Sequence, residues 1–317
     1  MKKIIKTAAV IGGAAELFAS AYLFLYAFYR EKISLPANRK EEPPSKEWQI
    51  FLEKSREGEE WMKTQKTEQI TILSEEGLRL TGTMLWAEKD TGSTVIAVHG
   101  YRGNAIRDFA GSARFYHDMG YNLLMIHDRA HGDSEGKWIG FGWKDKEDIR
   151  RWCEYLVDRA QGNTQIALLG VSMGGAAVMM ASGDDLPSQV KCIIEDCGYS
   201  SVWDQLWHAY PRNCRFPKRL TMYLASGMNK LVNGFFFGEA SSVRQLKKNK
   251  RPVLFIHGGA DDFVPTSMVH EVFSATRGER RLLIVEEAGH ALSVVRDPEA
   301  YYGSIRKFLQ DYMQKGE

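Results

Sequence analysis

Short apolar runs alternate with longer segments of helical spacing from residue 67 to the C-terminus. The apolar runs cover residues 94–98, 122–126, 165–169, 190–195, 253–256 and 281–285. The segments of helical spacing cover residues 105–119, 144–158, 266–276 and 298–314. Strands that alternate with helices favour a mostly parallel central sheet with helices on both faces. Residues 69–73 and 78–86 predict a hairpin ahead of that sheet, so the expected fold class is α/β.

The alternation stops between Cys197 and Lys250, which predicts a helical cap insertion over residues 198–250. This stretch is rich in aromatic residues, among them Trp203 and Trp207. One interpretation is a lid whose aromatic side chains, Trp203 and Trp207 included, line an apolar substrate cleft. The alternative is that these side chains only hold the insertion to the core.

Two segments precede the main domain, which we assign to residues 67–317. Residues 7–29 are almost wholly apolar, interrupted by Glu16, and follow a lysine-rich start. This length predicts an N-terminal transmembrane signal-anchor over residues 1–32, with the main domain on the extracytoplasmic side of the cell membrane. A cleaved signal peptide is the alternative, because Ala19-Ser20-Ala21 resembles a cleavage site.

Residues 33–66 predict a linker followed by an amphipathic helix. Trp48, Phe51 and Trp61 recur there near helical spacing. We expect this helix to pack on the main domain. Contact with a membrane surface, or docking of a partner protein, are the alternatives.

The composition excludes several function classes. The 42 Lys and Arg residues nearly balance the 40 Asp and Glu residues, and no basic stripe predicts nucleic-acid binding. The four cysteines lack the spacing of a zinc site and are expected to be small buried side chains. His127 and His131 flank a glycine-rich strand exit, which favours a loop over a metal pair. We expect no metal and no organic cofactor.

The motif with the clearest chemistry is Gly170-Val171-Ser172-Met173-Gly174, between an apolar run and a helical segment. A serine at such a strand–turn–helix junction sits in a strained turn with its hydroxyl above the sheet. The flanking glycines let strand and helix pass closely, and the Met173 amide points into the space in front of the serine. Ser172 is therefore the candidate nucleophile, and Met173 supplies a candidate oxyanion donor.

A serine nucleophile needs a base, and the base needs an acid that orients it. His290 and Asp261 follow the last two predicted strands, and His290 is the candidate base. Asp261 is preferred over Asp262 as the acid because Val264-Pro265 begins three residues after it, a spacing that belongs to the family resemblance described below. The second oxyanion donor is expected from the loop after residues 94–98, at the Tyr101 amide.

These motifs, together with His99-Gly100 and Gly132-x-Ser134-x-Gly136, resemble the α/β-hydrolase superfamily from about Glu68 to the C-terminus. Within it the chain is similar to membrane-anchored bacterial serine hydrolases of the BEM46 and cinnamoyl-esterase-like group. The resemblance implies a Ser172–Asp261–His290 triad, an oxyanion hole at Tyr101 and Met173, and a cap that begins at residues 196–199.

The resulting expectation is a serine hydrolase that cleaves small-molecule carboxylic esters through an acyl-enzyme on Ser172. A peptidase or a thioesterase of the same fold is one alternative. A membrane-anchored binding protein that kept the fold without activity is another. A superfamily of this kind constrains the mechanism more than the substrate.

Overall fold

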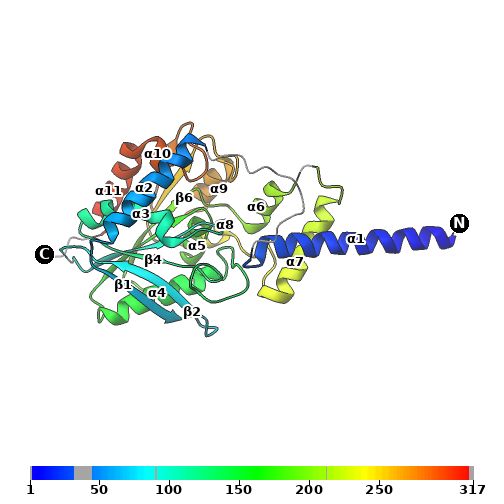
Figure 1. The fold of residues 1–317 in the computed structure, drawn as a ribbon, viewed down its shortest axis with the longest axis horizontal. Coiled ribbons are helices and arrows are strands. Elements are labelled where there is room, and N and C mark those ends of the chain that lie inside the picture. Colours follow the sequence, from blue (N-terminus) through cyan, green and yellow to red (C-terminus); the bar gives the residue numbers. More distant parts are fainter. Residues whose placement is uncertain (1, 32–44, 90, 212, 314–317) are drawn as a thin grey trace.

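The computed structural model describes residues 2–31, 45–89, 91–211 and 213–313, with side chains from residue 12 onward in the first helix. An eight-stranded sheet with the order β1-β2-β4-β3-β5-β6-β7-β8 forms the centre of the molecule (Figure 1). β1 pairs antiparallel with β2, and β2 pairs antiparallel with β4. The other pairs are parallel, which confirms the predicted α/β fold class.

The strands are β1 (Thr67–Leu73), β2 (Arg79–Leu85), β3 (Ser93–Val98), β4 (Asn122–Ile126), β5 (Gln165–Val171), β6 (Val190–Asp196), β7 (Val253–Gly258) and β8 (Arg280–Val285). The helices are α1 (Lys2–Phe28), α2 (Lys46–Met62), α3 (Ala105–Asp118), α4 (Asp145–Arg159), α5 (Met173–Ala181), α6 (Val202–Ala209), α7 (Lys218–Asn233), α8 (Ser242–Leu246), α9 (Ser267–Ala275), α10 (Ser293–Arg296) and α11 (Pro298–Tyr312).

The core has two layers because each inner strand is apolar on both faces. Along β3, Val95 and Ala97 face a cluster with α3 and α11, while Ile96 and Val98 face a cluster with α4, α5 and α9. Successive side chains of a pleated strand point to opposite faces of the sheet. Because both faces are buried here, the strand is a continuous apolar run in the sequence. The sheet is therefore held rigidly between helices, with its carboxyl edge free to carry a site.

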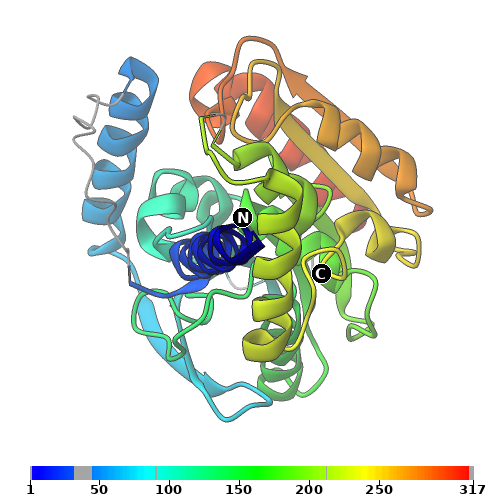
Figure 2. The same cartoon turned by 90° about the vertical axis from the view of Figure 1, so that its right-hand side faces the viewer.

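A third apolar cluster lies at that edge and joins the cap to α1. Residues 198–250 form α6, α7 and α8, and Figure 2, which looks along α1, shows α7 beside it. Phe28 of α1 is fully buried and stacks on Phe237 with ring centroids 5.2 Å apart. Glu16 is also buried, and its carboxylate accepts a hydrogen bond of 2.6 Å from the Thr221 hydroxyl of α7.

The predicted transmembrane signal-anchor is not supported. Within the described residues, no helix combines the length and the apolar character that crossing a bilayer requires. The apolar pattern that suggested a span has another cause at Phe24, Ala27 and Phe28, since these side chains are buried in the cluster with the cap. Membrane attachment is thus not shown, and the extracytoplasmic location stays a prediction.

The amphipathic helix of the 33–66 segment is α2, and the described part begins at Ser45. α2 packs closely on α3 through Gly58, where an added Cβ would meet the Ala110 carbonyl oxygen at 2.0 Å. The Ser55 hydroxyl also donates a hydrogen bond of 2.7 Å to the Arg107 carbonyl. This contact brings one end of α2 over the carboxyl edge of the sheet, where it borders the site described below.

We predict that Gly58→Ala destabilises the protein by about 1–3 kcal/mol, because the new methyl group must push α2 away from α3. Gly303→Ala is the matched control. It also lies within a helix, and no heavy atom stands within 4 Å of the added Cβ. That control should be neutral or stabilising by up to about 1 kcal/mol. Denaturant unfolding measures both, and equal stabilities would contradict the close contact.

Candidate active site

Ser172 occupies the sharp turn between β5 and α5. Its backbone has φ 57° and ψ −115°, a conformation that is costly for a residue with a side chain. The turn is tight on both sides: an added Cβ would lie 2.1 Å from the Gly174 oxygen at Gly170, and 2.0 Å from the Val98 oxygen at Gly174. Both positions therefore require glycine. The Ser172 amide donates a hydrogen bond of 2.8 Å to the Asp196 carbonyl, which ties the turn to β6.

His290 and Asp261 lie beside Ser172 and form a continuous hydrogen-bonded chain with it. His290 Nε2 is 2.8 Å from Ser172 Oγ, and His290 Nδ1 is 2.8 Å from Asp261 Oδ2. A carboxylate only accepts, so Nδ1 donates to Asp261 and Nε2 is left to accept the serine hydroxyl proton. Because the loops after β5, β7 and β8 all open at the same edge of the sheet, residues 172, 261 and 290 meet there.

Asp261, rather than Asp262, makes this contact. The Asp261 carboxyl group is fully buried, and its Oδ1 accepts hydrogen bonds from the Phe263 and Val264 amides at 3.0 and 2.9 Å. These bonds orient Oδ2 toward His290. Asp262 is exposed to solvent.

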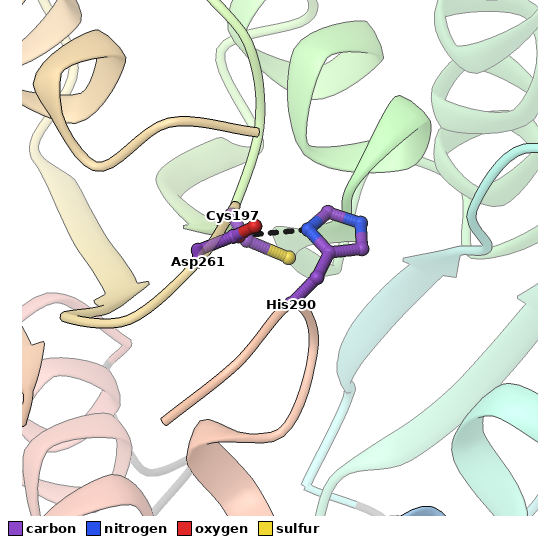
Figure 3. A group of neighbouring side chains, drawn as sticks. All are labelled: Cys197, Asp261 and His290. Carbon is purple, nitrogen blue, oxygen red and sulfur yellow. Dashed lines mark hydrogen bonds and ion pairs between the residues drawn. The ribbon is translucent and has the colours of Figure 1, made fainter. Parts of the chain in front are cut away.

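Cys197 stands next to this pair, as Figure 3 shows. Its Sγ, a carboxylate oxygen of Asp261 and a ring nitrogen of His290 all lie within 4.8 Å of one another. Burial raises the pKa of the Cys197 thiol well above its ordinary value, and the carboxylates of Asp196 and Asp261 add to this. The thiol therefore stays protonated. Asp261 Oδ2 and His290 Nδ1 already bond to each other at 2.8 Å, so the geometry favours a packing role for Cys197.

The two predicted oxyanion donors lie in segments next to Ser172. Met173 is the first residue of α5, and Tyr101 lies in the loop after β3. That loop runs against the nucleophile, since a Cβ added at Gly100 would be 3.4 Å from Ser172 Cβ. Within the described ranges, neither amide donates a hydrogen bond to another part of the chain. Their role as oxyanion donors stays a prediction.

A cavity of about 630 Å³ opens onto Ser172 and His290. Its apolar walls come from α2, α3 and the loops after β7 and β8, at Trp48, Phe51, Phe109, Phe263 and Leu292. The predicted cap residues Trp203 and Trp207 are not among the described residues that line it. They stack on each other with ring centroids 6.2 Å apart.

The side chain of Asp196 places a carboxyl group in the wall of this cavity. It is fully buried at the end of β6, and its Oδ2 accepts a hydrogen bond of 3.0 Å from the Tyr301 hydroxyl. Loss of solvation raises the pKa of Asp196 to about 6, although the Tyr301 bond and nearby His290 act in the opposite direction.

Two of the three histidines near the loop after β3 are held by hydrogen bonds within the protein. His99 Nε2 accepts from the Asp128 amide at 3.2 Å, so its Nδ1 donates to the Gly100 carbonyl at 2.8 Å. His131 Nε2 accepts from the Arg102 amide at 3.1 Å, and its Nδ1 donates to the Arg129 carbonyl at 3.0 Å. His127 packs against His99, with ring centroids 6.0 Å apart. Both nitrogens of His99 and of His131 are used within the protein.

Comparison with known proteins agrees with this architecture. A model of the prolyl oligopeptidase family matches residues 107–316. The chain belongs to the prolyl oligopeptidase family. It is thus a member of the α/β-hydrolase superfamily of hydrolases, as the motifs suggested. Closer kinship with the BEM46 and cinnamoyl-esterase-like group is not shown and stays a prediction.

The chain is also similar to individual proteins, by sequence in one case and by fold in two solved structures. The chain is 28% identical to the uncharacterized protein YqkD of Bacillus subtilis over 228 residues, which are 71% of this chain and 73% of YqkD. It superposes on the Pyrococcus furiosus esterase Pf2001 with a TM-score of 0.65 and 22% identity, covering 80% of this chain and 95% of the esterase. The Pyrococcus horikoshii acylaminoacyl peptidase gives a TM-score of 0.60 at 18% identity, covering 82% of this chain but 44% of the peptidase.

Sequence reasoning missed three contributors to the site: the wall formed by α2, the buried Asp196, and the α1 end that contacts the Tyr101 loop. The spacing of Trp48 and Phe51 signalled an apolar helix face but not the surface that it covers. Asp196 was recognised only as the start of the cap.

We predict that Asp196 makes stability fall as pH rises. Its folded-state pKa of about 6 lies above the ordinary 3.8, so the folded protein holds this proton more tightly than the unfolded chain. Its contribution is fully present below about pH 4 and is lost as pH rises through about 6. The loss approaches about 3 kcal/mol, at 1.36 kcal/mol for each pKa unit.

Urea unfolding of wild type and Asp196→Asn at pH 4, 5.5 and 7.5 tests this. The stability of the variant relative to wild type should improve by about 2–3 kcal/mol between the two ends of the series. The exposed Asp158→Asn is the control and should show no such trend. A difference between Asp196→Asn and wild type that is constant with pH would contradict the prediction.

Proposed function

We propose that the protein is a serine hydrolase that cleaves carboxylic esters through an acyl-enzyme on Ser172. The observation that carries this proposal is the hydrogen-bonded chain from Asp261 through His290 to Ser172, with the serine held in a strained turn. Such a chain is what nucleophilic catalysis at serine requires.

In the first half-reaction Ser172 Oγ attacks the acyl carbonyl carbon, and His290 Nε2 takes the hydroxyl proton. Asp261 holds the His290 tautomer and stabilises the imidazolium. The amides of Tyr101 and Met173 donate to the oxyanion of the tetrahedral intermediate. The intermediate collapses when the ester C–O bond breaks, and His290 gives its proton to the departing alcohol.

In the second half-reaction a water molecule attacks the acyl carbon of the Ser172 ester. His290 takes a proton from this water, and the same two amides hold the new oxyanion. Collapse releases the carboxylic acid, and His290 returns its proton to Ser172 Oγ. Every step is a proton transfer or an acyl transfer, so the proposed cycle uses only side chains and backbone of this chain and water.

The cavity argues for an apolar substrate group of moderate size. Its volume of about 630 Å³ lies in the range of small-molecule sites, and Trp48, Phe51 and Phe263 supply apolar walls beside the nucleophile. We therefore assign the acyl chain of the ester to the space between α2 and the loop after β7.

A peptidase is the second candidate, favoured by membership of the prolyl oligopeptidase family. The same acyl-enzyme mechanism cleaves amides, with His290 protonating an amine instead of an alcohol. A thioesterase differs only in the leaving group. Turnover of matched ester, thioester and aminoacyl-amide substrates separates these candidates. A folded protein that turns over none of them and does not react with a fluorophosphonate probe would favour a binding protein.

We predict that a fluorophosphonate probe labels the wild type and fails to label Ser172→Ala. His290→Ala should label more slowly by about 10²–10⁴, because the general base is lost. Ser188→Ala, which changes an exposed serine away from the site, is the control and should label as the wild type does. In-gel fluorescence measures the label, and unchanged labelling of Ser172→Ala would refute the assignment of the nucleophile.

We predict that Trp48→Ala selectively weakens the hydrolysis of long-chain esters. If the indole covers about two methylene groups, its loss costs about 1.6 kcal/mol, or about tenfold in kcat/KM. The comparison is between octanoyl and acetyl esters of p-nitrophenol, with the acetyl ester little affected. Trp207→Ala changes a tryptophan outside the cavity and tests the alternative cap site. A chain-length effect for Trp207→Ala alone would place the acyl group under the cap instead.

A further inference from the structure

The C-terminal end of α1 is bound by the residue that follows Tyr101. The Arg102 guanidinium donates hydrogen bonds to the carbonyls of Tyr29 and Arg30 at 2.8 Å each, and to the Tyr26 carbonyl at 3.1 Å. The last carbonyls of a helix lack partners within the helix and carry a partial negative charge. With its five donors, the Arg102 guanidinium binds one such carbonyl of α1, at Tyr26, together with the carbonyls of the two residues that follow the helix.

The Tyr101 side chain binds the same helix end. Its hydroxyl donates to the Ala27 carbonyl at 2.9 Å, and Arg102 Nε donates to that hydroxyl at 3.0 Å. The side chains of two consecutive residues, Tyr101 and Arg102, therefore both bind the end of α1. The Tyr101 amide belongs to the same short loop, which runs against Ser172.

The backbone at Arg102 needs such support. Its φ of 51° lies in the left-handed region, which a residue with a side chain adopts only where its surroundings hold it. The Arg102 amide donates to His131 Nε2 at 3.1 Å, so the loop after β4 provides one anchor. The Arg102 side chain provides the other anchor, on α1.

The end of α1 and the residues just after it also bind the loop that carries His131. The Arg30 guanidinium donates to the Ser134 carbonyl at 2.7 Å and to the Gly132 carbonyl. Backbone bonds join the same segments, from the Arg30 amide to the Lys137 carbonyl at 2.8 Å and from the Ile139 amide to the Phe28 carbonyl at 2.7 Å. Both anchors of Arg102 therefore lead back to the end of α1.

We propose that Arg102 is a positioning residue for the reaction, and that the C-terminal end of α1 is the support against which it sets the Tyr101 amide. In this proposal α1, which is not part of the sheet, completes the oxyanion hole of this chain. This inference rests on the proposed function, because it assigns an oxyanion to the Tyr101 amide.

Arg102→Ala in the full-length protein tests the proposal. Loss of an oxyanion donor lowers kcat by about 10²–10³, and a displaced donor retains part of its effect. We expect kcat for p-nitrophenyl acetate to fall about 10–100-fold while KM changes less than about threefold. Arg102→Lys keeps the charge but lacks the planar fork, so its kcat should lie between those of wild type and Arg102→Ala.

The controls separate positioning from loss of structure. Arg114→Ala removes an exposed arginine of α3 that does not line the cavity, and it should keep wild-type kcat and KM. Rates are expressed per site titrated by fluorophosphonate, so a partly unfolded sample does not imitate a lower kcat. If Arg102→Ala does not fold, Arg102→Lys and Tyr101→Phe carry the test, and both should lower kcat at nearly constant KM.

Two results would overturn the inference. Unchanged kcat in the folded Arg102 variants would show that α1 does not support the donor. A raised KM with unchanged kcat would assign Arg102 to substrate binding instead. Failure of the proposed function has a different signature, since the wild type itself would then neither label nor hydrolyse esters, and both proposals would fall.

Discussion

The close approach of β5, α5 and β3 at Ser172 is the constraint on which the rest of the structure depends. Two glycines let these backbones pass within distances that no Cβ allows, and the serine is held at φ 57° as a result. The cost of that conformation is met by packing of the sheet between two helical layers. A rigid sheet thus presents one hydroxyl at its carboxyl edge, where loops from other strands reach it.

The remaining parts of the site follow from the order of the strands. β3 and β6 flank β5, and β7 and β8 continue the parallel sheet on the β6 side. Each strand delivers its next loop to the same edge, so the Tyr101 loop and residues 172, 261 and 290 converge without any long segment of irregular chain. The cap, α1 and α2 then close around this edge from outside the sheet.

The sequence predicted the sheet well because a buried parallel strand has a distinctive pattern, an apolar run between helical segments. It also identified the residues that the structure brings together at Ser172, since strand ends in such a sheet meet at one edge. For α1 the predicted membrane span is not supported, because hydropathy shows that a face is apolar but not what covers it. Phe24 and Phe28 are apolar in sequence whether lipid or Phe237 surrounds them.

The same limit applies to the cavity wall. Trp48 and Trp203 are both tryptophans on amphipathic segments, and local pattern does not say which one faces the nucleophile. That difference is set by tertiary packing, through the contact of Gly58 with Ala110 that draws α2 over the sheet edge. The bonds from Arg102 to α1 were hidden for a related reason, because they join segments about 70 residues apart through backbone carbonyls.

The central claim is that Ser172 carries an acyl group during turnover. Intact-protein mass spectrometry after rapid acid quench of the wild type with p-nitrophenyl acetate tests it most directly. We predict a protein species heavier by one acetyl group, with the acetyl group on the peptide that contains Ser172. Turnover without any acyl adduct, or with the adduct on another residue, would contradict the account.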